Sequence, residues 1–353
     1  MTIQELLKFT SDAGASDLHI SAGSFPMVRV HGKMKKLNIP QMSEEEIQNL
    51  IFSVMNESQI EMFHEKLEID FSTKLSNEVR FRVNAFTQIN GLAAAFRVIP
   101  NEIKSYEELY LPETLKSLTY KEKGLILVTG PTGSGKSTTL ATMIDSINDH
   151  SQKHIITIED PIEFVHKSKN SLVNQRELGH DTHSFTAALR SALREDPDVI
   201  LVGEMRDLET VSLALTASET GHLVFATLHT SSATKSIDRI IDMFPKEQQA
   251  QIRSMLSESL EAVIAQTLLP TKDGNGRVPA LEIMIANAAV RNLIREEKTY
   301  QIPSVIQSGT KEGMQTKDQS LYNHVMNGNL DRKTAEKVAD NPKIFATGAG
   351  LNG

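Results

Sequence analysis

The segment from Gly130 to Thr138 reads GPTGSGKST and matches the spacing G-x-x-x-x-G-K-[ST]. Glycines at these positions let the backbone wrap closely, so that its N–H groups face phosphate oxygens. The lysine then reaches the outer phosphates, and the hydroxyl after it reaches Mg²⁺. An apolar run, LILV, precedes the loop and a helical pattern follows it, which is the context a phosphate loop requires. We predict a nucleotide site formed by Gly130, Pro131, Thr132, Gly133, Ser134, Gly135, Lys136, Ser137 and Thr138.

Carboxylates follow two further apolar runs, as hydrolysis of a bound nucleotide requires. Phosphoryl transfer to water needs a second magnesium anchor and a group that orients the water. In DPDVILVGEMRD, Glu204 comes two residues after the predicted strand 199–202, and in HIITIEDPIEF, Glu163 comes after the predicted strand 155–158. We predict that Glu204 joins Ser137 on the magnesium shell and that Glu163 orients the water. A solvated acid at a strand end is the alternative for each.

Two histidines bracket one predicted strand in GHLVFATLHT. Seven residues of extended chain separate His222 from His229 by roughly 23 Å and place them on opposite faces, so they cannot share one metal ion. His229, at the carboxyl end, can approach a γ-phosphate. For His222, at the other end, bonding to the neighbouring backbone is at least as good an explanation.

Arginines gather on the polar face of a predicted hairpin. In EVRFRVNAF the alternation turns Arg82 away from the apolar face. If Asn90 and Gly91 form a two-residue turn, Asn84 pairs with Arg97, which then lies diagonal to Arg82 at about 7 Å. These arginines are predicted to meet an anion, as arginine fingers that stabilise phosphoryl transfer. Surface salt bridges are the alternative.

The elements that must hold these groups fall into four segments. Residues 1–100 predict a small α+β domain, with helical spacing near the start, a capping box in SEEE and three β-rich runs. Residues 101–118 are predicted to be a linker. In 119–286, the runs LILV, IITI, VILV, LVFATL and PALEIM alternate with helices, which predicts a parallel sheet covered on both faces. Residues 287–353 predict polar helices that end in a frayed tail, ATGAGLNG.

Composition narrows the class of protein. The 353 residues carry a formal net charge of −8, which argues against a generic nucleic-acid binder. Cysteine is absent, so disulfides and thiolate zinc sites are excluded. The first residues do not have the layout of a secretory signal, and no apolar run approaches the roughly 20 residues that span a bilayer. We expect a soluble, cytoplasmic protein.

Four motifs together resemble a known family. GPTGSGKST, ITIEDPIEF, DPDVILVGEMRD and TGHLVFATLHT resemble, in order and spacing, the Walker A, Asp, Walker B and His boxes of type II/IV secretion ATPases. The resemblance implies an α/β fold, with a RecA-like P-loop domain preceded by a PAS-like domain. It also implies a homohexamer that binds ATP and Mg²⁺ between its domains, with Arg82 and Arg97 as fingers, and it places His222 in the catalytic set.

A second signature narrows the resemblance to the retraction ATPases of type IV pili. AVRNLIRE, residues 289–296, is similar to their signature. Val290, Leu293 and Ile294 should pack on the chain's own domain. Arg291 and Arg295, four residues apart, form a basic stripe that is predicted to meet the pilus machinery. A merely solvated basic face is the alternative.

The resemblance implies a motor for pilus retraction and twitching motility, at the cytoplasmic face of the inner membrane, where a platform protein would be its partner. Extension and secretion members usually insert a four-cysteine zinc module, and the absence of cysteine favours retraction. Pilus extension or type II secretion remains an alternative. A nucleic-acid-stimulated RecA-like ATPase is disfavoured by the acidic charge and the 5% aromatic content, and a small-molecule kinase would have no use for a separate arginine-bearing domain. No N-K-x-D guanine signature occurs, so ATP is predicted over GTP.

Overall fold

A computed structural model describes residues 1–30, 32–75, 79–99 and 102–345 of the chain. Contacts divide the chain into two compact units, which are described separately. The first unit comprises Met1–Glu102 with Glu163–Val165, and the second comprises Ile103–Ile162 with His166–Gly353. The expected frayed tail, 346–353, lies outside the described residues, as do residues 100 and 101 of the segment around the expected linker.

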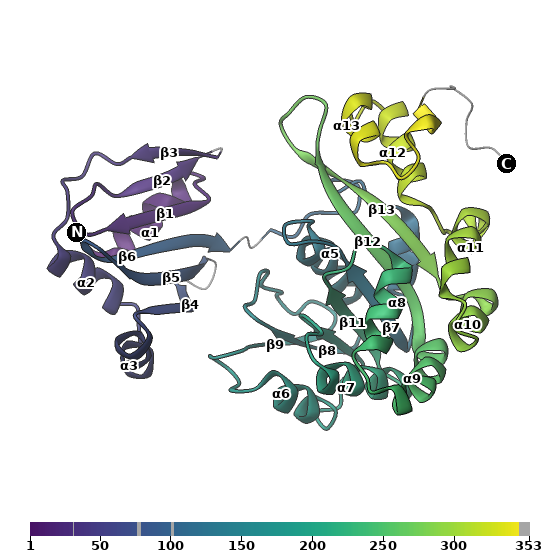
Figure 1. The fold of residues 1–353 in the computed structure, drawn as a ribbon. Helices are drawn as coiled ribbons and strands as arrows, with labels where there is room; N and C mark the ends of the chain where they lie inside the picture. The colour runs from purple at the N-terminus through teal and green to yellow at the C-terminus, as the bar shows by residue number, and fades with distance from the viewer. Residues whose placement is uncertain (31, 76–78, 100–101, 346–353) are drawn as a thin grey trace. The chain divides into compact units, whose positions relative to one another are not determined.

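The first unit contains a six-stranded antiparallel sheet in the order β3-β2-β1-β6-β5-β4. Helices α1, α2 and α3 share one hydrophobic cluster with the strands, so they cover one face of the sheet (Figure 1). This arrangement is the small α+β domain that the sequence predicts. The strands are β1 (Asp17–Ser21), β2 (Met27–Val30), β3 (Lys33–Lys36), β4 (Glu68–Lys74), β5 (Arg80–Gln88) and β6 (Gly91–Ile99), and the helices are α1 (Ile3–Asp12), α2 (Glu44–Phe52) and α3 (Glu57–Lys66).

Local sequence signals account for the helix starts in this unit. At α2 the predicted capping box is present, since Ser43 Oγ accepts from the Glu46 N–H and Glu46 Oε2 accepts from the Ser43 N–H. Thr2 and Glu5 make the same reciprocal pair at α1. Each pair satisfies two of the N–H groups that a helix start leaves without partners.

The hairpin of β5 and β6 forms, but its predicted register is wrong. Gln88 pairs with Gly91, so the two turn residues are Ile89 and Asn90. Gly91, with φ of 110°, is instead the first residue of β6. Because the turn lies one residue earlier than expected, every cross-strand pair shifts, and Arg82 lies directly opposite Arg97.

The second unit is built on a seven-stranded sheet in the order β13-β12-β7-β11-β10-β8-β9. Strands β7 to β12 pair in parallel, which confirms the predicted α/β class. The expectation for PALEIM was wrong, because this run lies in β13, which is antiparallel to β12. The strands are β7 (Gly124–Thr129), β8 (His154–Glu159), β9 (Leu172–Glu177), β10 (Val199–Val202), β11 (Leu223–Leu228), β12 (Leu260–Pro270) and β13 (Arg277–Ile285).

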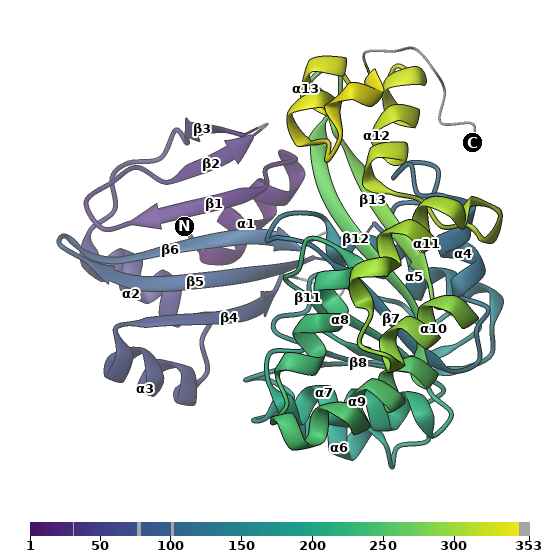
Figure 2. The same cartoon turned by 45° about the vertical axis from the view of Figure 1, so that its right-hand side comes forward.

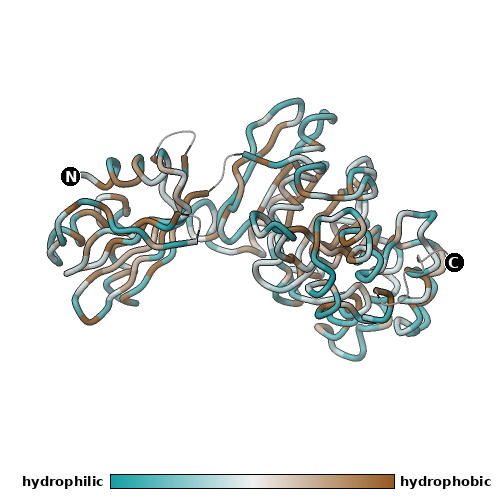
Figure 3. Tube along the Cα trace, turned by 90° about the horizontal axis from the view of Figure 1, so that it is seen from above, coloured by the Kyte–Doolittle hydropathy of each residue, from teal (hydrophilic) through white to brown (hydrophobic). Residues whose placement is uncertain are grey.

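Helices cover both faces of this sheet, as predicted (Figures 1 and 2). Along β7, Leu125 and Leu127 join one hydrophobic cluster, while Ile126 and Val128 join another on the opposite face. The strands are therefore buried on both sides, and Figure 3 shows hydrophobic stretches running through the interior of each unit. The first face carries α6 (Phe185–Ala192), α7 (Leu208–Glu219), α8 (Ala233–Asp242), α9 (Lys246–Ser259), α10 (Ala288–Arg295) and α11 (Ile302–Ser308), and the second carries α4 (Glu113–Leu118) and α5 (Lys136–His150).

The remaining helices, α12 (Lys317–Met326) and α13 (Arg332–Val338), pack with a short 3₁₀ segment, Pro342–Phe345, against β12 and β13. Two further 3₁₀ turns, Thr299–Gln301 and Thr310–Glu312, flank α11. Within the described residues, no helix is both long enough and apolar enough to span a bilayer.

The segment expected to be a linker is largely part of the second unit. Tyr106, Leu111, Leu115 and Leu118 are buried in the cluster beneath α5. Thr142 Oγ1 also donates to the Lys104 carbonyl. Buried apolar side chains three and four residues apart give α4 one packed face, a pattern that is easily missed in so short a helix.

Candidate functional site

The segment 130–138 forms a glycine-rich loop between β7 and α5. Gly130, Gly133 and Gly135 have φ of 146°, 78° and 87°, values that side-chain-bearing residues rarely adopt. Gly135 is the N-cap of α5 and supplies no side-chain hydrogen bond to the first turn. The N–H groups at the positive end of this helix are therefore not capped by a side chain, as an anion site requires.

Lys136 lies folded over the same loop. Its Nζ donates to the Gly130 carbonyl at 2.9 Å and to the Pro131 carbonyl at 3.2 Å. A long cationic side chain held by loop carbonyls is already next to the position where phosphates would meet the helix end. The loop geometry and Lys136 thus fit a nucleotide phosphate chain.

Charged side chains meet at the carboxyl ends of the strands beside the loop. Glu204 Oε2 lies 2.8 Å from Arg206 Nε, and Glu204 Oε1 lies 3.2 Å from His229 Nε2. Arg206 also reaches Asp160, with NH1 3.3 Å from Oδ2. We call these four residues the carboxylate cluster. The hydrogen bond to Glu204 raises the pKa of Arg206 above its usual value.

Sheet order explains why the carboxylate cluster and the loop share one edge. Parallel strands β7, β11, β10 and β8 are neighbours, and they end at the loop, His229, Glu204 and Asp160 respectively. Gly203 eases close approach of the strands, because a Cβ there would lie 3.1 Å from the Ile158 carbonyl oxygen and 3.2 Å from Glu159 Cα, tighter than most such contacts. The predicted neighbourhood of Glu204, His229 and the loop is therefore present in the fold.

Glu163, the predicted water-orienting base, is exposed in the segment that follows β8, and it is grouped with the first unit. It follows Asp160, a member of the carboxylate cluster, by three residues. The role of Glu163 stays a prediction.

His222 lies at the opposite end of β11 from His229. Its ring Nδ1 is 2.9 Å from the Ala217 carbonyl oxygen, at the end of α7, and 3.3 Å from Thr220 Oγ1. Within one chain it therefore bonds to neighbouring backbone, as the geometric alternative anticipated. The catalytic role that the family resemblance implied for His222 stays a prediction.

Arg82 and Arg97 lie side by side in the first unit, and each faces an acid. Arg97 Nε is 2.9 Å from Asp17 Oδ1, and Arg82 Nε is 3.7 Å from Asp70 Oδ1. Asp17 is 5% exposed. Although burial raises its pKa, hydrogen bonds from Ser16 and Arg97 outweigh that effect and leave the pKa below its usual value. Salt bridging, the predicted alternative, thus occurs in both cases.

The two arginines of the signature helix α10 differ sharply. Arg291 NH1 donates to the carbonyls of Ser257 and Glu258 at the end of α9, and its NH2 donates to Glu261. Arg295 is exposed and makes one long hydrogen bond, 3.4 Å, to Ser257 Oγ. Arg291 thus links α10 to the end of α9 and the start of β12 through hydrogen bonds within the chain. The predicted contact of Arg291 and Arg295 with the pilus machinery stays a prediction.

The apolar stripe of α10 packs as predicted. Val290 and Ile294 are fully buried, and Leu293 is partly buried against the same cluster.

Sequence reasoning assigned no role in the site to Asp160, Arg206 or Gln266. Asp160 is one of the acids that follow the predicted strand 155–158, and Arg206 follows Glu204 by two residues, a spacing that could have signalled it. Gln266, in LEAVIAQTLLP, contacts the loop from β12. Its signal was a polar residue in the middle of an apolar run.

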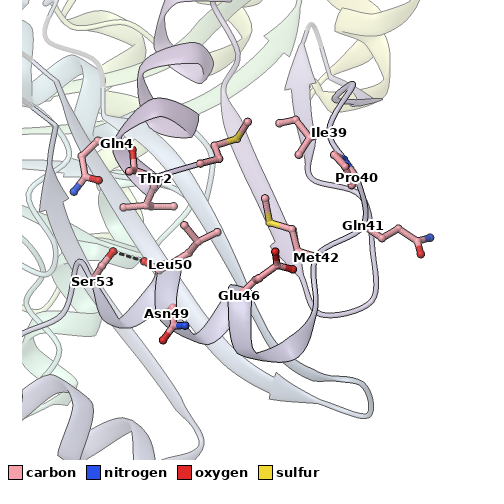
Figure 4. Close-up of a pocket in the computed structure, with 12 residues that line it drawn as sticks. Thr2, Gln4, Ile39, Pro40, Gln41, Met42, Glu46, Asn49, Leu50 and Ser53 are labelled. Carbon is pink, nitrogen blue, oxygen red and sulfur yellow. Dashed lines mark hydrogen bonds between the residues drawn. The ribbon is translucent and has the colours of Figure 1, made fainter.

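A separate pocket of about 590 Å³ lies within the first unit, between the start of α1, the segment 39–42 and α2 (Figure 4). Met42 and Leu50 line it, and Ser53 Oγ donates to the Leu50 carbonyl beside it. Its lining, all of it within the described residues, includes none of the predicted site residues.

Comparison with known proteins places this geometry in a family. Residues 1–337 match the family described as "Type II/IV secretion system protein". The chain is 56% identical to the "Type IV pilus retractation ATPase PilT" of Pseudomonas aeruginosa, over 98% of this chain and 100% of the relative. It is 60% identical to a "Twitching motility protein" of Neisseria gonorrhoeae, over 91% of this chain and 86% of the relative.

A solved structure agrees with these relatives. The crystal structure of "the Pilus Retraction Motor PilT and Bound ADP" superposes with a TM-score of 0.90 at 50% identity and covers 98% of both chains. Sequence and fold therefore match over nearly the whole chain. The chain belongs to the type II/IV secretion system protein family.

Proposed function

We propose that this chain is an ATP-hydrolysing motor that powers retraction of type IV pili and twitching motility. The observation that carries the proposal is the end-to-end match, at 56% identity, to a pilus retraction ATPase. The site supports it, since a phosphate loop and a carboxylate cluster lie at the ends of neighbouring parallel strands. This is where ligands bind in open α/β sheets.

The residues present fit ATP with Mg²⁺. The loop N–H groups and Lys136 would hold the phosphates. Ser137, at the first turn of α5, and Glu204, partly through water, would hold the metal ion. A bound Mg²⁺ supplies charge neutralisation of the phosphate oxygens. Arg206 and His229 contact separate oxygens of Glu204 and thereby fix its carboxylate at the sheet edge, while Glu163 would orient the attacking water.

The working form we propose is a homohexamer. Arg82 and Arg97 would serve as arginine fingers, so hydrolysis would require the arginine-bearing unit to meet a loaded phosphate loop. The motor would act at the cytoplasmic face of the inner membrane, on a platform protein of the pilus machinery. No nucleic acid is needed.

The biochemical test uses the purified full-length chain. On size-exclusion chromatography we expect the Mg²⁺-dependent ATPase activity to co-elute with a species of hexamer mass. We expect no stimulation of that activity by single-stranded DNA. Lys136→Ala should abolish hydrolysis, because it removes the ammonium group that would contact the nucleotide phosphates. Glu204→Gln should lower kcat by about a hundredfold or more while ADP still binds.

A monomer that hydrolyses ATP at full rate would argue against the motor. Several-fold stimulation by single-stranded DNA would instead favour a nucleic-acid-dependent ATPase.

A further inference from the structure

Gln266 projects from β12 onto the phosphate loop. β12 pairs in parallel with β7, and Ala265 lies opposite Thr129, so the next residue along β12 lies beside the start of the loop. Gln266 is 4% exposed. Its Nε2 donates to the Ser134 carbonyl at 2.7 Å, and its Oε1 accepts from Thr139 Oγ1 at 2.8 Å. One buried side chain thus bridges the loop and the first turns of α5.

The chemistry of these two contacts fixes the orientation of the amide. A carbonyl can only accept, so the NH₂ group of Gln266 must face Ser134, and the amide oxygen must then face the Thr139 hydroxyl, which donates. A loop that turns its N–H groups toward phosphates turns carbonyls into the protein, where each buried carbonyl needs a donor. Gln266 is that donor for Ser134.

The fixed glycines of the loop make room for this residue. A Cβ at Gly130 would lie 2.3 Å from the Gln266 carbonyl oxygen, and a Cβ at Gly135 would lie 2.8 Å from Gln266 Nε2. Gly130 is therefore required here for close packing against the backbone of β12, while Gly135 leaves room for the amide of Gln266, and both have positive φ. The glycines of the loop and Gln266 of β12 are therefore packed directly against one another.

We propose that Gln266 is a positioning residue of the nucleotide site, which holds the loop in its phosphate-binding shape before a nucleotide arrives. It acts through Ser134 and Thr139 and does not touch phosphate itself. Without it the loop populates other shapes, and the apparent Kd for nucleotide rises to the intrinsic Kd divided by the fraction of molecules that keep the competent shape. The inference rests on the nucleotide binding proposed above.

The test measures binding directly. Full-length wild-type chain, Gln266→Leu and a control, Ser320→Ala, are titrated with ADP and Mg²⁺. Amide hydrogen exchange across residues 130–139 is measured without nucleotide, and kcat is measured at saturating ATP. Ser320 is a matched control because it is 5% exposed and its Oγ accepts one hydrogen bond, from the Leu281 N–H, in the same unit.

We expect Gln266→Leu to raise the Kd for ADP by about tenfold or more, to speed exchange across the loop, and to leave kcat within about threefold. Ser320→Ala should change neither binding nor loop exchange. A Kd for Gln266→Leu within about twofold of the wild-type value, or equal weakening by Ser320→Ala, would overturn the inference.

If Gln266→Leu does not fold, Thr139→Val decides the matter. It removes the hydroxyl that holds the amide oxygen and should raise the Kd about threefold, and an unchanged Kd would overturn the inference. Wild-type chain that fails to bind ADP would count against the proposed function itself, a result distinct from equal binding by wild-type and variant chains.

Discussion

The two carboxylate oxygens of Glu204 contact different neighbours, Arg206 at Oε2 and His229 at Oε1. Arg206 also spans to Asp160, so it screens two carboxylates that would otherwise repel each other. The Arg206 guanidinium therefore helps to set the positions of both carboxylates, Glu204 and Asp160. A planar fork with several donors suits that role better than a lysine.

Replacing Arg206 should therefore slow hydrolysis. We expect Arg206→Gln to lower kcat about tenfold or more, with a smaller change in ADP affinity, because Glu204 loses its position and not its charge. Arg206→Lys should recover only part of the rate. The measurement is steady-state hydrolysis together with ADP titration.

The control is Arg190→Gln, which breaks an exposed pair with Glu209 whose two side chains are 60% and 56% exposed. It should leave kcat unchanged. Arg206→Gln with a wild-type kcat would show that the contact is incidental.

The two proposed fingers should differ in stability. Arg97→Gln removes a partner of buried Asp17 and should cost on the order of 1 kcal/mol of unfolding free energy, while Arg82→Gln breaks a longer, exposed pair and should cost less than about 0.5 kcal/mol. Urea denaturation at neutral pH checks both. Equal costs would contradict the role assigned to Asp17.

The cost of losing Arg97 also depends on pH. The pKa of Asp17 is held below its usual value in the folded state, so its ion pairs stabilise the fold above about pH 3.9. That stabilisation is lost as pH falls through the lower folded pKa, and the difference between Arg97→Gln and wild type should shrink there.

At the scale of elements, α10 is attached to the sheet by Arg291, whose guanidinium caps two carbonyls at the end of α9 and pairs with Glu261 at the start of β12. Cations near a helix carboxyl end also favour its dipole. Arg295, one turn further on, is exposed and donates a long hydrogen bond to Ser257 Oγ. The signature helix therefore offers one structural arginine and one exposed one.

The prediction is a split between these two variants. Arg291→Gln should lower the unfolding free energy by about 1–3 kcal/mol, because it leaves hydrogen-bond acceptors unpaired, while Arg295→Gln should change it by less than about 0.5 kcal/mol. Calorimetric melting of the purified chain tests this. Equal Tm values for Arg291→Gln and wild type would contradict the structural role assigned to Arg291.

The sequence predicted most of the elements but missed particular ones for physical reasons. The motif strands were found because fully buried parallel strands are short apolar runs between turns. β12 was missed because α9 passes into it at Leu260 without a loop, so LEAVIAQTLLP carries no boundary signal. The hairpin register failed because Gly91 has a turn-like φ yet lies in the strand. Contacts such as that of Gln266 come from sheet order, which no local pattern contains.

For the whole molecule, the two units carry complementary parts of the proposed chemistry. The second unit holds the phosphate loop and the carboxylate cluster, and the first holds Arg82 and Arg97 on one strand pair. Arginine fingers are worth on the order of 10³–10⁵ in rate, so a subunit that lacks them should be nearly inactive. If hydrolysis requires the arginine-bearing unit to contact a nucleotide-loaded phosphate loop, each hydrolysis event is coupled to a movement, which is what a motor needs.

If hydrolysis by this chain retracts pili, imaging of labelled pili on living cells should show it. Cells of the native organism without this chain are complemented with wild-type chain or with Glu204→Gln. We predict that cells with no chain, or with the variant, carry excess pili that extend but do not retract, and that wild-type chain restores retraction. Pili that retract at the normal frequency without this chain would show that it is not the retraction motor.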